Sequence, residues 1–207
     1  MLYFATIDTP TLGLLNKLMQ LPMLKSLRLV GGTALALQIG HRKSVDLDFF
    51  GSFPIESLDF EVLLHEFLNV TSLKRSEKIN IFNINNIKVD FVNYKYPWLS
   101  DAVYHDGIRL ASLEDIAAMK LAAITGRGSK KDFIDLYFLL EKFTLQQMLG
   151  FYQQKYADAA GYMLLKSLTY FEDAETEPQP EMLFDVSWQQ IKHFLCEAVE
   201  SYTTSLQ

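Results

Sequence analysis

The sequence predicts an α+β fold: a β-sheet with flanking helices over residues 1–110, followed by a C-terminal helical bundle over residues 111–207. Up to about residue 110, polar and apolar residues mostly alternate in short runs, which is the period of a β-strand. Beyond that point apolar residues recur every three to four positions, which is the period of an amphipathic helix. A helix-like run between two strand-like runs, over 27–50, indicates that the first half also carries helices.

The elements of the first half follow from this periodicity and from the glycine and asparagine residues that end them. Gly40 follows a helical run, and glycine is common just past a helix end. Asn85 and Asn86 separate two alternating runs and tolerate positive φ, so they predict a β-hairpin. The expected helices cover 11–25, 33–40 and 60–68, and the expected strands cover 27–30, 45–51, 78–84, 87–94 and 107–112.

The second half is expected to be helical throughout, apart from one loop. Ser112 and Asp115 have the spacing of a capping box at the start of the first helix, and Ser129 is the expected N-cap of the second. The residues 126–129 break the chain between these two helices. Helices are expected over 112–125, 129–143, 144–156, 158–171 and 187–204, with an acidic, proline-containing loop over 172–183.

The composition indicates a globular protein of the cytoplasm. It is 49% hydrophobic and 21% charged, and it has one cysteine, Cys196, so it forms no internal disulfide. The N-terminal residues lack the basic segment and apolar core of a signal peptide, and no apolar run is long enough for a membrane span. We therefore expect a protein of the reducing cytoplasm.

The charges are distributed unevenly, although the formal net charge is −6. Two stretches, 9–45 and 116–131, contain no acid and several bases, so they are candidate surfaces for phosphates. The alternative is that they are solvated faces and loops. The bases are Lys17, Lys25, Arg28, Arg42 and Lys43 in the first stretch, and Lys120, Arg127, Lys130 and Lys131 in the second.

The residues "GGTALALQIGHRKSVDLDFF", 31–50, carry the pattern that indicates chemistry. Asp46 and Asp48 lie two apart on an expected strand, so they share a face, where like charges repel unless a cation compensates. Gly32 and Thr33 stand between a strand and a helix N-terminus, which attracts phosphate. Asp90 lies on a later strand, and three such carboxylates would hold two Mg²⁺ ions about 4 Å apart for an in-line displacement.

This pattern resembles the nucleotidyltransferase superfamily that includes DNA polymerase β, and more closely the AbiEii/AbiGii-type toxin family. The resemblance rests on residues 31–50, 89–92 and 113–141 and covers roughly 28–142. Many superfamily members have Gly-Ser where this chain has Gly32-Thr33, and threonine keeps the hydroxyl. The resemblance implies a nucleotidyltransferase-type mixed sheet, with a helical domain that completes the active site.

The resemblance also implies roles for individual residues. It implies Mg²⁺- or Mn²⁺-dependent transfer of a nucleoside monophosphate from an NTP to an acceptor hydroxyl. Asp46, Asp48 and Asp90 would hold metal, with Lys120 and Asp132, or Asp135 in its place, completing the catalytic set. The candidate NTP-binding residues are Gly31, Gly32, Thr33, Arg42, Ser44 and Lys120.

Several alternatives stay open at this level. Lys120 could lay its stem on an apolar helix face with its ammonium in solvent, and Asp132 could serve only the helix dipole. The toxin resemblance implies an RNA acceptor, such as tRNA, and a cognate antitoxin protein. One rival is transfer to a small molecule such as an antibiotic, and another is a nucleotide-binding or interaction module without catalysis. The four histidines lack metal-ligand spacing, and we assign them no chemistry.

Overall fold

The computed structural model describes residues 1–52, 65–157 and 161–206, and in it the chain forms two compact units. The first unit comprises Met1–Tyr96 and Ala102–Ala111. The second comprises Pro97–Asp101 and Ser112–Gln207, so a short piece of chain within the first half belongs to the helical unit. No helix in the described part of the chain is both long and apolar enough to cross a membrane.

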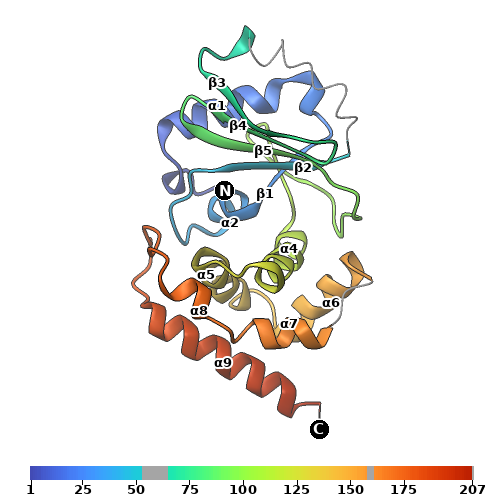
Figure 1. The fold of residues 1–207 in the computed structure, drawn as a ribbon, viewed down its shortest axis with the longest axis vertical. Helices are drawn as coiled ribbons and strands as arrows, with labels where there is room; N and C mark the ends of the chain where they lie inside the picture. Colours follow the sequence, from blue (N-terminus) through green and yellow to red (C-terminus); the bar gives the residue numbers. More distant parts are fainter. Residues whose placement is uncertain (53–64, 158–160, 207) are drawn as a thin grey trace. The chain divides into compact units, whose positions relative to one another are not determined.

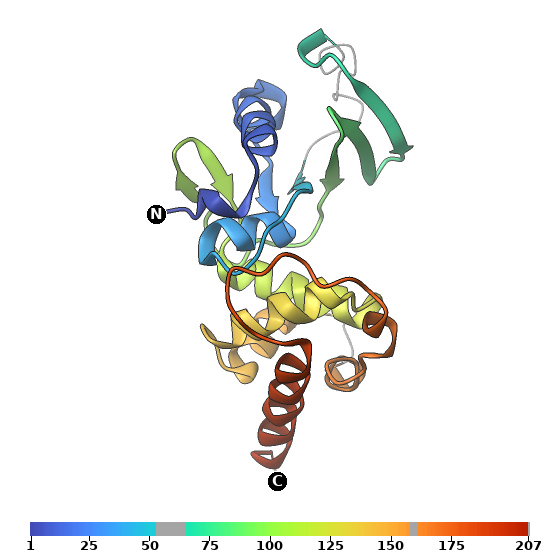
Figure 2. The same cartoon turned by 90° about the vertical axis from the view of Figure 1, so that its left-hand side faces the viewer.

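The first unit is built on a seven-stranded mixed sheet with the strand order β3-β4-β5-β2-β1-β7-β6. The β2–β5 and β1–β7 pairs are parallel, and the other four pairs are antiparallel. Figure 2 shows the β6–β7 hairpin towards one end of the sheet and β3–β5 towards the other. The strands are β1 (Arg28–Val30), β2 (Leu47–Gly51), β3 (Val70–Arg75), β4 (Ile79–Ile84), β5 (Ile87–Asn93), β6 (Val103–His105) and β7 (Ile108–Leu110).

Strands β2 and β5 alternate between buried and half-buried residues, as the period-two pattern predicts. Their buried faces carry Phe49 and Phe91, whose rings stack with centroids 5.5 Å apart, and Phe82 of β4 meets Phe91 edge-on. All three rings are almost fully buried, so they anchor the two strands by apolar burial. Burial of these rings also fixes which way the opposite faces of β2 and β5 point, and these faces carry Asp48 and Asp90.

The helices of the first unit form where their caps and turns predict them. Helix α1 (Thr9–Gln20) begins two residues before the expected start, because the Asp8 carboxylate caps it by accepting a 2.7 Å hydrogen bond from the Thr11 amide. Helix α2 (Gly31–Ile39) follows β1 directly and ends at Gly40, which has φ 74°. Short 3₁₀ turns cover Phe4–Thr6 and Pro22–Leu24. Figure 1 shows α1, β1 and α2 in the blue part of the chain.

The hairpin at Asn85-Asn86 is confirmed, whereas two strands are additional to those expected. Asn85 and Asn86 have φ 53° and 67°, and they join β4 to β5. Strand β3 was not predicted because most of it is exposed on both faces, so its residues show no alternation. Strand β6 pairs with β7 through a tight turn at Asp106 (φ 49°) and Gly107 (φ 79°), a sequence typical of such hairpins.

Arg109 on β7 ties the connection before β1 to the sheet. Its guanidinium donates to the backbone carbonyls of Met19 (3.0 Å), Leu24 (3.1 Å) and Leu27 (3.2 Å). Burial lowers the pKa of the Arg109 guanidinium, against an opposing effect of Tyr104. This side chain therefore satisfies three carbonyl groups at the turn between α1 and β1, a structural role that sequence periodicity does not reveal.

The second unit is helical, and its first two helices begin at the predicted caps, Ser112 and Ser129. Ser112 accepts from the Asp115 amide, and Ser129, Thr144 and Ser187 each form a capping box. The predicted loop at 172–183 differs in its first residues, which form a short helix. The helices are α4 (Leu113–Gly126), α5 (Lys130–Leu140), α6 (Leu145–Lys155), α7 (Gly161–Ser167), α8 (Glu172–Glu175) and α9 (Trp188–Thr204). Most of the expected helix 60–68 lies outside the described residues, as do 158–160.

A fully buried ion pair holds the segment Pro97–Asp101 within the helical unit. Lys155 Nζ of α6 lies 2.6 Å from Asp115 Oδ1 of α4, and neither side chain is exposed. Lys155 also donates to the Pro97 carbonyl (2.6 Å), and the Asp115 carboxylate accepts from the amides of Leu99 (3.0 Å) and Ser100 (3.4 Å). The Lys155–Asp115 pair therefore holds the segment Pro97–Asp101 against α4 and α6.

Candidate active site

The sheet brings two of the three predicted carboxylates into direct register. Asp48 of β2 and Asp90 of β5 are Cα partners across the parallel pair, so their side chains share one face of the sheet. Asp46 directly precedes β2, and all three aspartates are half-buried. Between them in sequence, Leu47 is fully buried on the other face. Asp48 therefore lies on the face of β2 opposite to the core, and Val45, two residues before the strand, is exposed.

The glycine pair that precedes Thr33 leaves room for two functional side chains. Gly31 opens α2 with φ 68°, and a Cβ built on it would collide with Asp48 Oδ2. A Cβ on Gly32 would collide with Arg42 Nη2. The N-cap residue of α2 is Val30, which offers no side-chain cap hydrogen bond. The glycines thus bring the start of a helix next to a carboxylate and a guanidinium, which larger residues would displace.

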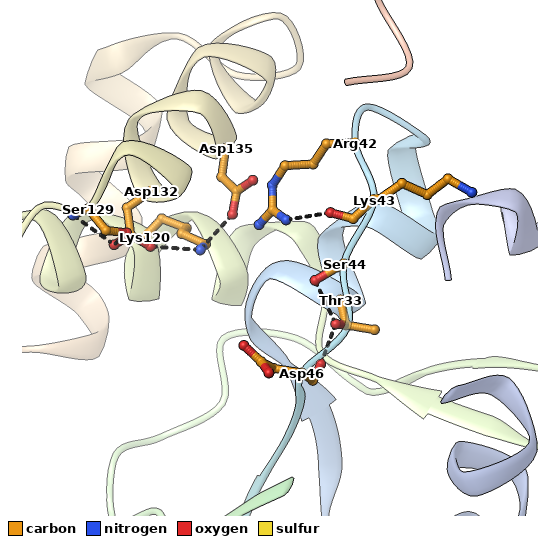
Figure 3. Close-up of polar contacts among 9 residues, drawn as sticks. All are labelled: Thr33, Arg42, Lys43, Ser44, Asp46, Lys120, Ser129, Asp132 and Asp135. Atoms are coloured by element: carbon orange, nitrogen blue, oxygen red, sulfur yellow. Dashed lines mark hydrogen bonds and ion pairs between the residues drawn. The ribbon is translucent and has the colours of Figure 1, made fainter. Parts of the chain in front are cut away.

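Thr33 and Arg42 are buried and make contacts within the first unit. The Thr33 hydroxyl is 2.8 Å from Ser44 Oγ and also donates to the Asp46 backbone carbonyl, which fixes the chain just before β2 (Figure 3). Arg42 Nη1 donates to the Lys43 carbonyl at 2.9 Å, and Arg42 is only 2% exposed. Thr33 therefore positions the segment that bears Asp46, a structural role that the sequence did not predict.

Asp90 has a cationic neighbour on its own strand. Lys88 stands two residues before Asp90 on β5, and its Nζ lies 2.7 Å from Asp90 Oδ1. The same oxygen is shielded from solvent and has no hydrogen bond of acceptable geometry, so the contact is an ion pair of charges rather than a directed bond. The spacing that placed Asp46 and Asp48 on one face would also have placed Lys88 beside Asp90.

The carboxylates fit a divalent cation in type and in register. Magnesium is commonly held by one or two carboxylates together with waters and substrate phosphates. Asp48 and Asp90 supply such a pair, and the buried Asp90 Oδ1 is an acceptor without a hydrogen bond. Within the described ranges, however, no three His, Cys, Asp or Glu side chains come close enough to enclose a metal. Asp48 and Asp90 are therefore candidate ligands for one cation and do not form a complete metal cage.

The helical unit contains a second cluster of charged residues, centred on Lys120 of α4. Its Nζ lies 2.9 Å from Asp132 Oδ1 and 2.6 Å from Asp135 Oδ2, both on α5 (Figure 3). Lys120 is 7% exposed, so it does not extend its ammonium into solvent as one reading of the sequence suggested. One lysine thus bridges two aspartates that lie three residues apart on a neighbouring helix.

Asp132 caps the start of α5 in addition to its ion pair with Lys120. Its Oδ2 accepts from the Ser129 hydroxyl (2.6 Å) and amide (3.2 Å), which completes the capping box of α5. Burial would raise the pKa of Asp132, but the charge of Lys120 and the hydrogen bonds from Ser129 and Lys120 outweigh it. The pKa of Asp132 therefore lies below its ordinary value, so that this carboxylate stays charged near neutral pH.

The basic stretch 116–131 is less available to phosphate than its sequence suggests. Lys130 is 6% exposed, and its Nζ donates to the backbone carbonyls of Glu175 (3.1 Å) and Glu177. The Glu177 carboxylate in turn accepts from the Lys130 amide at 2.9 Å. The acidic segment thus caps the start of α5, which gives this segment a structural role. Of the four bases in the stretch, Arg127 and Lys131 are exposed.

A comparison with known protein families identifies the class of this protein. A sequence profile described as "Nucleotidyl transferase AbiEii toxin, Type IV TA system" matches residues 13–201. The chain therefore belongs to the AbiEii nucleotidyltransferase family. It is also 36% identical over 194 residues to an uncharacterised protein, aq_aa25, of Aquifex aeolicus. The alignment covers 91% of this chain and 93% of that protein.

Solved structures share the fold at low sequence identity. A nucleotidyltransferase of Helicobacter pylori, described as putative, has a TM-score of 0.59 at 17% identity and covers 97% of this chain and 99% of that one. MenT4, a nucleotidyltransferase toxin of Mycobacterium tuberculosis H37Rv, has a TM-score of 0.50 at 16% identity and covers 90% of this chain and 83% of that one. These similarities confirm the predicted α+β nucleotidyltransferase fold.

Proposed function

We propose that the protein transfers a nucleoside monophosphate from an NTP to an acceptor hydroxyl with the help of Mg²⁺ or Mn²⁺. The observation that carries this proposal is the register of Asp48 with Asp90 beside Gly31 at the start of α2. A pair of adjacent carboxylates next to a helix N-terminus suits a cation-bound phosphate chain. Membership of the AbiEii family supports the same reaction class.

The reaction needs one bond to form and one to break. The acceptor oxygen attacks the α-phosphorus, the bond from that phosphorus to the bridging oxygen breaks, and pyrophosphate leaves. We assign the proton of the acceptor hydroxyl to Asp90, because its half-buried carboxylate is the natural base on this face. Bound cations would stabilise charge on the attacking and leaving oxygens. Asp46 and Asp48 complete the proposed ligand set.

For the phosphate groups we propose the first turn of α2 together with cationic side chains. The amides of Gly31, Gly32 and Thr33 are the candidate donors, since the Thr33 hydroxyl is engaged with Ser44 and the Asp46 carbonyl. Arg42 and Ser44 are candidate contributors from the same segment. Lys120 and Asp132 remain predicted members of the catalytic set, and a substitution of Lys120 tests that prediction.

Replacing Lys120 by methionine should weaken NTP binding by about tenfold or more, since a charged phosphate contact is worth roughly 1.5–3 kcal/mol. The same change should lower the free energy of unfolding by a similar amount, because Asp132 and Asp135 lose their counter-ion. NTP affinity is measured by calorimetry below the unfolding temperature, and stability by urea denaturation. Lys131→Met, an exposed residue of the next helix, is the control.

The stability loss in Lys120→Met should depend on pH. In the wild type, the depressed pKa of Asp132 stabilises the fold above the ordinary carboxylate pKa, and this contribution disappears as the pH falls. Without Lys120, burial raises the Asp132 pKa, so protonation relieves the unpaired charge in acid. The difference between mutant and wild type should therefore shrink towards about pH 4. Unchanged NTP affinity would leave Lys120 a purely structural residue.

As acceptor we propose RNA, such as tRNA, and we propose that a cognate antitoxin protein restrains the enzyme in the cytoplasm. Both proposals follow from the toxin family rather than from a contact in the structure. The exposed bases of the first unit, Lys17 and Lys25 among them, provide positive charge in an overall acidic chain. A polyanionic acceptor would be held in part by such charges and would bind less tightly at high salt.

Incubation with each labelled NTP, Mg²⁺ and total cellular RNA should transfer label to RNA. The labelling should decline between low and moderate salt, because counterions compete for the phosphates. Wild-type protein without Mg²⁺ and the Asp48→Asn variant serve as controls, and both should leave the RNA unlabelled. Label found only on added small hydroxylated compounds, with little salt dependence, would replace the RNA acceptor by a small molecule.

A further inference from the structure

Lys88 and Asp90 form an ion pair within the proposed metal site. They lie two residues apart on β5, so their side chains share the face of the sheet that also carries Asp48. The Lys88 side chain is 43% exposed, whereas that of Asp90 is 17% exposed. The Lys88 side chain is thus partly in solvent, whereas the Asp90 carboxylate that it contacts is mostly buried.

The surroundings of Asp90 explain why a cation is held there. Across the sheet Asp90 is paired with Asp48 on one side and with Ile81 on the other. The first neighbour is a like charge, and the second is aliphatic and offers no counter-charge. The Lys88 ammonium, 2.7 Å from Asp90 Oδ1, therefore offsets part of the repulsion between the Asp90 and Asp48 carboxylates.

The geometry of this contact suits a replaceable cation. Asp90 Oδ1 is shielded from solvent, and Lys88 approaches it without the alignment of a hydrogen bond. The attraction is therefore that of charge alone, and a divalent ion bound by Asp48 and Asp90 would supply more charge at the same oxygen. A half-exposed lysine can withdraw into water at little cost, because such ion pairs contribute little to stability.

On this basis we propose that Lys88 is an internal counter-ion which occupies Asp90 when metal is absent and which the metal must displace. Lys88 is thus a positioning residue that orients the Asp90 carboxylate. The inference rests on the proposed metal site at Asp48 and Asp90. It adds that the affinity of this site is set by competition with a lysine of the same strand.

The test is binding of Mn²⁺ alone, measured by the electron paramagnetic resonance signal of free Mn²⁺ without any nucleotide. Lys88→Met keeps the aliphatic stem and removes the competing charge, so its Mn²⁺ Kd should be roughly two- to fivefold lower than that of the wild type. Lys78→Met is the matched control, because Lys78 is an exposed lysine in the turn before β4. Its Kd should equal the wild-type value.

Asp90→Asn separates competition at Asp90 from a general effect of charge. In the Asp90→Asn background, adding Lys88→Met should not tighten Mn²⁺ binding. A general electrostatic effect would instead lower the Kd in both backgrounds and in Lys78→Met, which would overturn the proposal. The unfolding temperature of each variant, with and without Mn²⁺, shows that every variant is folded and reports binding a second time.

The failure of this inference is distinguishable from failure of the proposed function. If the wild type and Lys88→Met bind Mn²⁺ equally, the metal site stands and the role of Lys88 is wrong. If neither binds Mn²⁺ and neither is stabilised by it, the metal site itself is wrong. Weaker binding in Lys88→Met would also overturn the proposal, because it would make Lys88 a support of the site rather than a competitor.

Discussion

The Asp48→Asn variant should fold normally and lose nucleotidyl transfer by on the order of a thousandfold. Removing one carboxylate from a metal site forfeits several kcal/mol of stabilisation in the transition state, at about 1.4 kcal/mol for each factor of ten. Stability should be unchanged or slightly higher, because Asp48 and Asp90 are neighbouring like charges in register. Transfer of label from NTP to acceptor measures the first effect, and thermal unfolding without metal measures the second.

The control for this result is Asp101→Asn, which makes the same chemical change at an exposed position. It should retain full activity. Asp46→Asn should behave like Asp48→Asn if both carboxylates act in the reaction, since Asp46 directly precedes β2. An Asp48→Asn protein with wild-type activity would refute the assignment of this aspartate to the metal.

The Lys155→Met variant should lower the free energy of unfolding by about 3–5 kcal/mol, because it leaves Asp115 charged, buried and without its ammonium partner. This is a large fraction of the stability of an ordinary domain. Urea denaturation followed by circular dichroism measures the loss. Lys142→Met, at an exposed position, should change stability little.

A double variant distinguishes an unpaired charge from lost packing. Asp115→Asn combined with Lys155→Met removes both charges, so it should recover part of the stability that Lys155→Met loses. If the double variant is less stable than the single one by a full further increment, the two side chains contribute independently. That outcome would contradict the interpretation of Asp115 and Lys155 as one buried pair.

Local patterns in the sequence were enough to predict much of the fold. The Asn85-Asn86 turn, Gly40 and the serine caps at 112 and 129 act on adjacent residues of the chain, so their effect can be predicted from the local sequence. Strand β3 could not be read in this way, because exposure on both faces removes the alternation by which strands are recognised. Its position at the edge of the sheet explains that exposure.

The candidate site divides in the same way. A period of two predicts a common face for Asp46 and Asp48, and the same rule would have placed Lys88 beside Asp90. The direct opposition of Asp48 and Asp90 across β2 and β5 required the register of the sheet. The pairing of Lys155 with Asp115, 40 residues apart, depends entirely on helix packing. Long-range ion pairs of this kind leave no periodic signal in a sequence.

Because Pro97–Asp101 belongs to the helical unit, the two units of this protein are not readily exchanged by recombination. A recombination event that joined a foreign sheet domain to a helical half starting at Ser112 would lose the Leu99 and Ser100 amides that serve Asp115. It would also lose the Pro97 carbonyl that serves Lys155. A recombinant protein would fold well only if the new sheet domain supplied an equivalent of Pro97–Asp101. The two units are therefore expected to evolve together rather than as interchangeable modules.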